Sequence, residues 1–116
     1  MADAQLGAEI ARLLSLDEQR LYELIGRELT GRQALPMTPA ELAERGRKWF
    51  RAHRDQIQRS VCDSRTLREL TERSDELQLV AAIADLIAAI CVDVAPTTVA
   101  VLLLKHGLNR LCDEVW

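Results

Sequence analysis

The residues that could catalyse a reaction or bind a metal are few and widely spaced in this sequence. The only histidines are His53 and His106, and the only cysteines are Cys62, Cys91 and Cys112. Grouping His106 with Cys112 and Cys91 matches no zinc-ligand spacing. The three cysteines lie in or near apolar runs, where a cysteine packs as a small hydrophobic residue. The sequence therefore predicts no metal site and no cofactor.

The most unusual carboxylates are Asp85 and Asp93, which interrupt the most hydrophobic part of the chain. Asp93 can accept hydrogen bonds at the turn before Pro96, whereas Asp85 needs a basic partner or a position that faces water. No second acid is convincingly placed for a paired-carboxylate hydrolase. The chain also lacks a phosphate-binding loop, a GxSxG motif and a nucleotide fingerprint. We therefore expect no catalytic residue, no small-molecule substrate and no enzyme activity.

Length and composition indicate one soluble globular domain over residues 1–116. Hydrophobic residues make up 48% of the chain and charged residues 28%, but aromatic residues only 3%, so the core must be aliphatic. The first residues, MADAQLGAEIARL, lack the features of a signal peptide. Three cysteines without a CxxC pair favour a reduced, cytoplasmic protein.

Helix start and stop signals predict an all-α fold, a single-domain bundle of five to six helices. Ser15 with Glu18 predicts a capping box at the second helix, and Thr38 with Glu41 predicts one at the third. Whether residues 65–92 form one helix or two stays open. The expected helices cover 3–14, a segment from Ser15 to a stop at Gly31, 39–61, 65–73, 76–92 and 96 to the C-terminus.

Two segments near the C-terminal end, 79–92 and 97–104, are apolar on nearly all sides. Helices of this kind are buried, so we expect both at the centre of the bundle. Asp85, Asp93 and Pro96 divide this region into arms shorter than the ~20 residues of a membrane-spanning helix. A membrane role is therefore not expected. The residues predicted to be largely buried are Leu86, Ile87, Ile90, Val101, Leu104 and Leu108.

The stretch TPAELAERGRKWFRAHRD, residues 38–55, is rich in basic side chains although the whole chain has a net charge of −3. Arg47, Arg51 and Arg54 follow one ridge at i, i+4 and i+7, here called the arginine ridge, which we expect to point away from the core. The opposite, apolar face of this helix holds Leu42, Gly46, Trp49, Phe50, His53 and Ile57. Trp49 and Phe50 are thus expected in the core, and His53 as a hydrogen-bonded core histidine.

Charge is unevenly distributed along the chain. Residues 1–31 have three basic and six acidic side chains, residues 32–60 seven and three, and residues 61–116 five and nine. Three explanations remain open for the basic middle: a solvated face neutralised by the chain's own carboxylates, a protein-docking surface, or a nucleic-acid contact. A pI near 5.4 makes nucleic acid the least favoured. Docking to another copy would pair the arginine ridge with Glu18, Glu23 and Glu28.

Two stretches, LSLDEQRLYELIGRELTG near the start and PTTVAVLLLKHGLNRLCDEVW at the end, resemble the bacterial death-like and effector-associated adaptor domains of antiphage and other conflict systems. The third helix is longer, and the last more apolar, than that family's pattern. The resemblance implies an adaptor that binds like with like through charged helix faces and recruits or restrains an effector. Alternative hypotheses are an immunity or antitoxin-like inhibitor of a toxin, and a nucleic-acid-binding regulator that uses helix 39–61.

Overall fold

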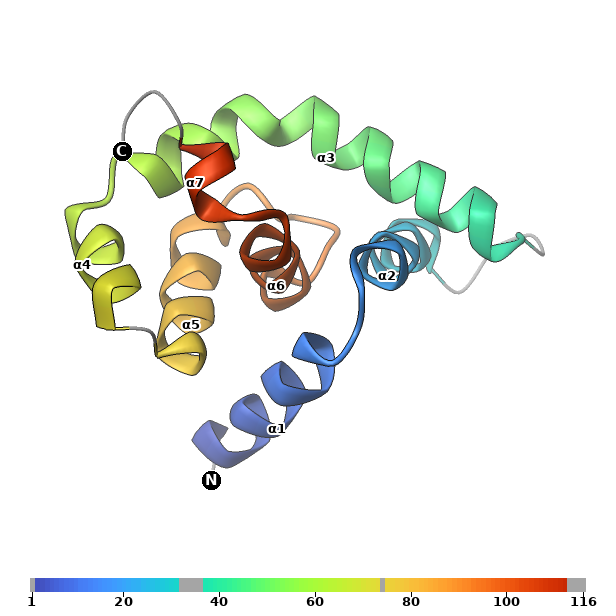
Figure 1. Ribbon diagram of the computed structural model, residues 1–116. Helices are drawn as coiled ribbons and strands as arrows, with labels where there is room; N and C mark the ends of the chain where they lie inside the picture. Colours follow the sequence, from blue (N-terminus) through green and yellow to red (C-terminus); the bar gives the residue numbers. More distant parts are fainter. Residues whose placement is uncertain (1, 32–36, 74, 113–116) are drawn as a thin grey trace.

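Helices account for most of the described part of the chain, as Figure 1 shows. The computed structural model describes residues 2–31, 37–73 and 75–112, and no strand occurs in these ranges. The predicted all-α class is therefore confirmed. The helices are α1 (Ala2–Leu14), α2 (Glu18–Thr30), α3 (Pro39–Cys62), α4 (Arg65–Arg73), α5 (Glu76–Ile87), α6 (Pro96–His106) and α7 (Leu108–Leu111).

Local capping explains where α2 and α3 begin. The Oγ1 atom of Thr38 accepts a hydrogen bond from the Glu41 N–H at 3.2 Å, and Oε1 of Glu41 accepts one from the Thr38 N–H at 3.3 Å. The predicted capping box of α3 is thus present. The prediction for α2 is wrong, because Asp17 caps that helix by accepting from the Arg20 N–H at 2.8 Å.

The region 65–92 contains two helices rather than one. Ser64 accepts a hydrogen bond from the Leu67 N–H at 3.2 Å and starts α4. Asp75 accepts one from the Gln78 N–H, also at 3.2 Å, and starts α5. Helix α5 then ends at Ile87, earlier than the predicted residue 92.

Gly107 divides the last predicted helix, which raises the number of helices above the expected five to six. Its φ of 105° lies in the left-handed region, and its N–H donates to the Leu103 carbonyl at 3.0 Å, so α6 ends here. The short α7 follows directly. The expected continuation of this helix to the C-terminus falls on residues 113–116, outside the described residues.

Helices α1, α2, α5 and α7 pack against α6, which lies between α2 and α5 (Figure 1). Helix α3 extends along one side of the molecule, and α2 crosses beneath its N-terminal half. Helix α1 packs at the edge, against α5 and α6. Six successive residues of α6, Thr98 to Leu103, are buried. None of the helices in the described ranges combines the length and apolarity needed to span a membrane.

The core is aliphatic, but α5 contributes less to it than its sequence predicts. Ile87 is fully buried, whereas Leu86 is 38% exposed. The predicted burial of Leu86 is therefore wrong, because α5 packs with one side only and turns the other to solvent. Of the other predicted core residues, Val101 and Leu108 are buried, while Ile90 and Leu104 are half-buried.

A disulfide connects the end of α3 to the residue that follows α7. Cys62 and Cys112 are bonded, with Cα atoms 5.4 Å apart. Nearby, the Gln58 side-chain amide donates to the Leu111 carbonyl at 2.8 Å. Cys91 is the free, buried cysteine. The prediction that all three cysteines are reduced is wrong for Cys62 and Cys112. Cysteine usage therefore no longer supports the predicted cytoplasmic location.

Candidate protein-docking surface

Helix α3 presents a long charged surface because only one of its sides is needed for the core. It has 24 residues and so extends about 36 Å. Its buried side is made by Leu42, Ala43, Gly46, Phe50, Ile57, Val61 and Cys62. Four exposed cations lie outside these buried positions and are here called the basic face of α3, made by Lys48, Arg51, Arg54 and Arg59, with the exposed Asp55 among them.

Arg47 belongs to the predicted arginine ridge, but its side chain is held within the fold. Its Nη2 donates a hydrogen bond to Oε1 of Gln19 in α2. The guanidinium carbon lies 5.3 Å from the centroid of the Tyr22 ring, a distance typical of cation–π contacts. Its Nη1 is 3.6 Å from Oε2 of Glu44. Arg47 therefore joins α3 to α2 and is only partly available to a partner.

Arg51 and Arg54 are more accessible than Arg47. Nη2 of Arg51 lies 3.1 Å from Oε1 of Glu44, so one carboxylate serves both Arg47 and Arg51. Surface ion pairs of this kind are typically worth under ~1 kcal/mol, so a partner's carboxylate can replace Glu44 at little cost. Within the described ranges, Lys48, Arg54 and Arg59 form no hydrogen bond or ion pair through their side chains.

The acidic residues expected to meet the arginine ridge differ in their surroundings. Glu28 is half-buried, and its carboxylate accepts hydrogen bonds from the Ala95 N–H at 3.0 Å and the Thr98 hydroxyl at 3.2 Å. It thereby caps the N-terminus of α6, where the helix dipole favours negative charge. Burial raises the pKa of Glu28, although both hydrogen bonds act in the opposite direction. Glu28 has an internal role and does not fit a docking surface.

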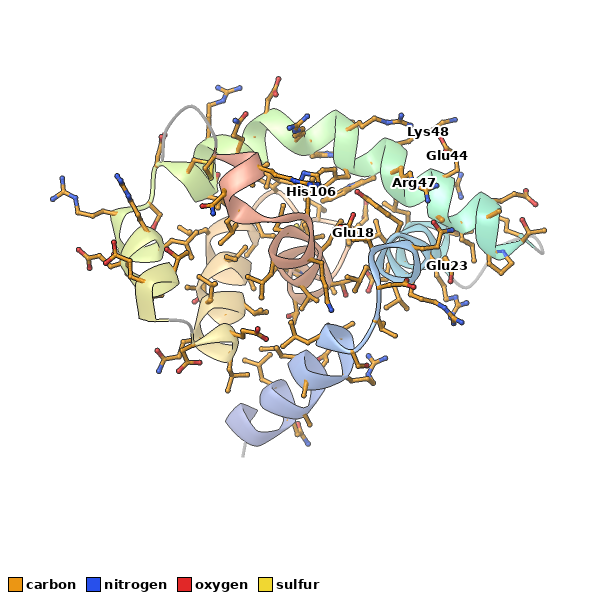
Figure 2. All side chains as sticks on the ribbon, viewed as in Figure 1. Glu18, Glu23, Glu44, Arg47, Lys48 and His106 are labelled. Carbon is orange, nitrogen blue, oxygen red and sulfur yellow. A yellow bond between two sulfur atoms is a disulfide. The ribbon has the colours of Figure 1, made fainter. Side chains whose placement is uncertain are left out.

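Glu18 and Glu23 lie half-exposed on α2, below the end of α3 that carries Glu44, Arg47 and Lys48 (Figure 2). Glu18 is near enough to Tyr22 to affect its ionisation. Burial raises the pKa of Tyr22 and Glu18 raises it further, whereas the three residues of the arginine ridge lower it. Acidic and basic side chains of the same chain therefore both lie near Tyr22. Glu18 partly neutralises the positive charge of the arginine ridge.

The aromatic and histidine side chains of α3 face inward rather than toward a nucleic acid. Phe50 is buried, with ring centroids of Tyr22 and His106 at 6.3 and 6.0 Å. The half-buried Trp49 stacks on His53 with centroids 4.5 Å apart. Nδ1 of His53 lies 2.8 Å from the Trp49 carbonyl, so this nitrogen carries the proton. No stacking platform for bases is exposed here.

The described ranges contain no group of three or more histidine, cysteine or acidic side chains placed to hold a metal. Sequence reasoning missed the internal roles of Glu44 and Glu28. For Glu44 a signal was present, since Arg47 and Arg51 follow it at i+3 and i+7 on the same helix. For Glu28 no local signal exists, because its partners are 67 and 70 residues away.

Comparison of the chain with protein-family models, with curated proteins and with solved structures finds no match in any of the three. A proposal about function therefore depends on the surfaces of the molecule itself.

Proposed function

We propose that this chain is a non-enzymatic protein–protein interaction module, an adaptor or oligomerisation domain that docks an acidic protein surface on the basic face of α3. The observation that carries the proposal is that the four cations of that face outnumber the two exposed carboxylates beside them, Glu44 and Asp55. Lys48, Arg54 and Arg59 have no internal ion pair in the described ranges, and Arg51 shares Glu44 with Arg47. Complementary charge of this kind increases association rates and selects partners.

The resemblance to death-like adaptor domains supplies a biological setting for the proposal, a bacterial defence or effector-recruitment system. The acidic surface would then belong to another copy or to an effector. The proposal does not depend on a cytoplasmic location, because the Cys62–Cys112 bond is of a kind that persists mainly in oxidising compartments. Glu18 and Glu23 remain the acidic candidates for contact between copies, since Glu28 is used inside the fold.

Sedimentation velocity and fluorescence anisotropy with a labelled glutamate-rich helical peptide test this function. We expect self-association or peptide binding at low salt, weakening as the screening length falls from about 30 Å to about 8 Å. The double variant Arg51→Glu/Arg54→Glu should lose binding by roughly tenfold or more. Circular dichroism should stay unchanged, because both side chains are exposed.

The matched control is Arg65→Glu/Arg68→Glu, which makes the same change of charge at exposed residues of α4. This control should bind like the unmodified protein. If the α3 and α4 variants lose binding equally, net charge and not the basic face is responsible. If a labelled DNA duplex binds more tightly than the peptide and depends on Arg51 and Arg54, the surface is a nucleic-acid contact instead.

A further inference from the structure

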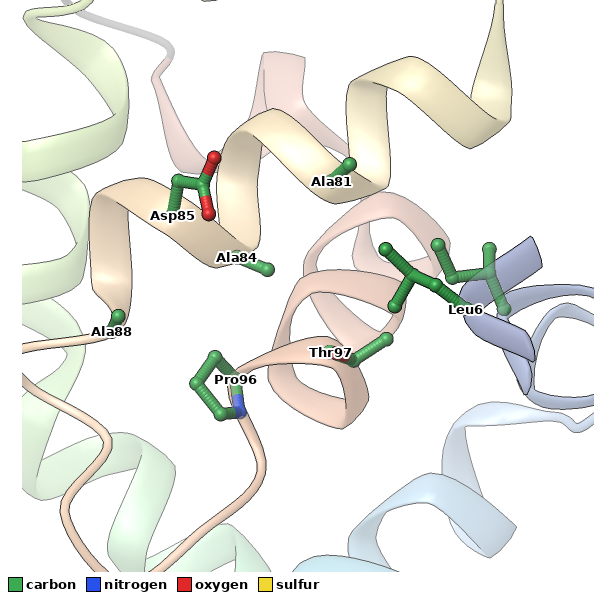
Figure 3. A pocket seen from close by; sticks show the side chains of 8 residues that line it. Leu6, Ala81, Ala84, Asp85, Ala88, Pro96 and Thr97 are labelled. Carbon is green, nitrogen blue, oxygen red and sulfur yellow. The ribbon is translucent and has the colours of Figure 1, made fainter. Parts of the chain in front are cut away.

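A second surface lies away from the basic face, in a groove between α1, α5 and the start of α6. Figure 3 shows this pocket from close by. Its volume is about 290 Å³, and its walls are mainly apolar. Leu6 and Ile10 of α1 form one side, Ala81 and Ala84 of α5 another, and Pro96 closes the end. This groove, together with Asp85 at its edge, is here called the α1–α5 groove.

Exposed apolar side chains extend the groove along α5. Leu6 is 38% exposed and Leu77 48%, although both are large and hydrophobic. Helix α1 passes close to Leu77, since a β-carbon on Gly7, the residue after Leu6, would be 3.9 Å from Cδ1 of Leu77. Leu77, Ala81 and Ala84 of α5 and its C-cap residue Ala88 recur at i, i+4, i+7 and i+11, so they form one stripe along this helix. A continuous apolar surface of this kind marks an interaction site more often than scattered single residues do.

The charge of the groove defines the partner. Asp85 is exposed, lines the groove and forms no hydrogen bond or ion pair in the described ranges. A partner that covers the apolar floor would remove water from this carboxylate, which is costly unless the partner supplies a cation. Two copies that met groove to groove would bring two carboxylates and no cation from the lining residues. The basic face of α3 in another copy has cations, but none of the exposed large hydrophobic residues in the described ranges lies on α3 to cover the apolar floor. Charge complementarity thus favours a basic partner over a second copy.

The shape of the groove favours a helix. From Leu77 to Ala88 the stripe is about 16 Å long, the length of three helical turns. The small alanine side chains at its floor let a second helix approach closely, and larger side chains of that helix can enter beside Leu6 and Ile10. We propose that the α1–α5 groove binds an amphipathic helix of a partner protein, with apolar residues at i, i+4 and i+7 and one lysine or arginine paired with Asp85.

This surface goes beyond the proposed function, because it gives the module two docking sites of opposite character. The basic face takes an acidic surface by charge, and the groove takes a basic amphipathic helix by apolar contact. An adaptor needs two such sites to bring two different proteins together.

Selection from a displayed library of helical peptides of about 14 residues, or four turns, tests the proposal. The unmodified protein is the target, and the Ala84→Leu variant, which fills the groove, is the counter-selection. We expect enriched peptides with apolar residues at i, i+4 and i+7 and a basic residue within one turn of them. The best peptide is then synthesised with its basic residue kept or changed to glutamate, and binding is measured by fluorescence anisotropy.

Asp85→Lys should weaken binding of the basic peptide by roughly tenfold and restore binding of the glutamate peptide. Glu69→Lys makes the same charge change at an exposed residue of α4. This variant should change the binding of neither peptide. Ala88→Leu blocks the exposed end of the stripe without touching the core, and keeps the test valid if Ala84→Leu fails to fold. If the selected peptides bind Asp85→Lys and Ala88→Leu as tightly as they bind the unmodified protein, the proposal is wrong.

Two further measurements separate the alternatives. Arg51→Glu/Arg54→Glu should leave binding of the basic peptide within about twofold, so failure of the basic face and failure of the groove are distinguishable. Sedimentation of the unmodified protein and of Ala88→Leu, alone and with anionic phosphatidylserine vesicles, completes the test. Self-association or vesicle binding lost in Ala88→Leu would assign the groove to another copy or to a lipid surface and reject the helical partner.

Discussion

Gly26 of α2 lies directly against the backbone carbonyl of Leu42 in α3. The contact is reciprocal, because Gly46 of α3 lies against the backbone carbonyl of Tyr22 in α2. A β-carbon at either glycine would overlap the carbonyl oxygen of the opposite helix. Glycine inside a helix normally costs about 1 kcal/mol relative to alanine. Here it permits the close backbone crossing that fixes the position of α3 and of its basic face.

The first prediction follows from this crossing. Gly26→Ala and Gly46→Ala should each lower the free energy of unfolding by about 3 kcal/mol or more, because backbone atoms cannot move aside as a flexible side chain can. Urea unfolding followed by circular dichroism measures the loss.

Gly7→Ala is the matched control, because Gly7 is also inside a helix but has room for a methyl group. Its nearest neighbour would be Cδ1 of Leu77 at 3.9 Å, an ordinary contact distance. This variant should raise the free energy of unfolding by up to about 1 kcal/mol. If Gly26→Ala behaves like Gly7→Ala, the two helices do not cross in the way described.

A second prediction compares two adjacent residues of α5. Ile87 is fully buried, so Ile87→Ala should lower the free energy of unfolding by about 2–5 kcal/mol through lost contacts and a cavity. Leu86 is 38% exposed, and Leu86→Ala should cost less than half as much. Equal losses in urea unfolding would show that α5 is rotated about its axis relative to this structure.

The disulfide gives a third prediction. Cys62 and Cys112 are 50 residues apart in sequence, so their bond restricts a long loop of the unfolded chain. Reduction should lower the free energy of unfolding by about 4 kcal/mol. Urea unfolding with and without dithiothreitol measures the difference, and a Cys62→Ala/Cys112→Ala variant should not respond to the reductant. If dithiothreitol does not change the free energy of unfolding of the unmodified protein, the Cys62–Cys112 bond is absent.

Cys91 is expected to be unreactive while the protein is folded. Burial raises its pKa from 9.0 to about 11, with a smaller contribution from Glu28, so very little thiolate exists near neutral pH. Iodoacetamide should label the folded protein slowly, and the unfolded, unreduced protein rapidly at one thiol per chain. Labelling at three thiols would contradict the disulfide.

The same pKa shift predicts how stability depends on alkaline pH. The unfolded thiol loses its proton at a lower pH than the folded one, so ionisation favours the unfolded state. The contribution of Cys91 to stability is therefore complete below about pH 9.0 and is lost as pH rises toward 11. Cys91→Ala should remove this part of the alkaline loss, which pH-dependent urea unfolding measures.

Glu28 provides the last prediction. Glu28→Ala should lower the free energy of unfolding by about 1–3 kcal/mol, because the Ala95 N–H and the Thr98 hydroxyl lose their acceptor. Glu28→Gln keeps an acceptor of the same shape and should cost less than half as much. Urea unfolding of both variants at neutral pH tests the difference, and equal losses would contradict the capping role.

The pH dependence of Glu28 has a definite sign. Burial raises its folded pKa, so the folded state binds a proton more readily than the unfolded state. Its contribution to stability is present below the unfolded pKa and is lost as pH rises through the folded pKa. On acidification from neutral pH, the unmodified protein should therefore gain stability relative to Glu28→Gln.

The amino-acid sequence determined the features that depend on neighbours within about one helical turn. The capping box at Thr38 is one example, because both of its hydrogen bonds join residues three apart. The buried and exposed sides of α3 are another, since helical periodicity alone separates Phe50 and Ile57 from Lys48 and Arg51. Local patterns therefore predicted the all-α class and the start of α3, but not the end of α5 or the break at Gly107.

Only the tertiary structure decided which faces meet. Helical periodicity shows which residues share a face, but it does not show which other helix covers that face. The Gly26–Leu42 crossing, the cap that Glu28 forms on α6 and the Cys62–Cys112 bond all join residues from different helices or their ends. The solvent-facing side of α5 follows from the same cause, because packing against α6 on one side leaves Leu86 exposed however apolar the segment is.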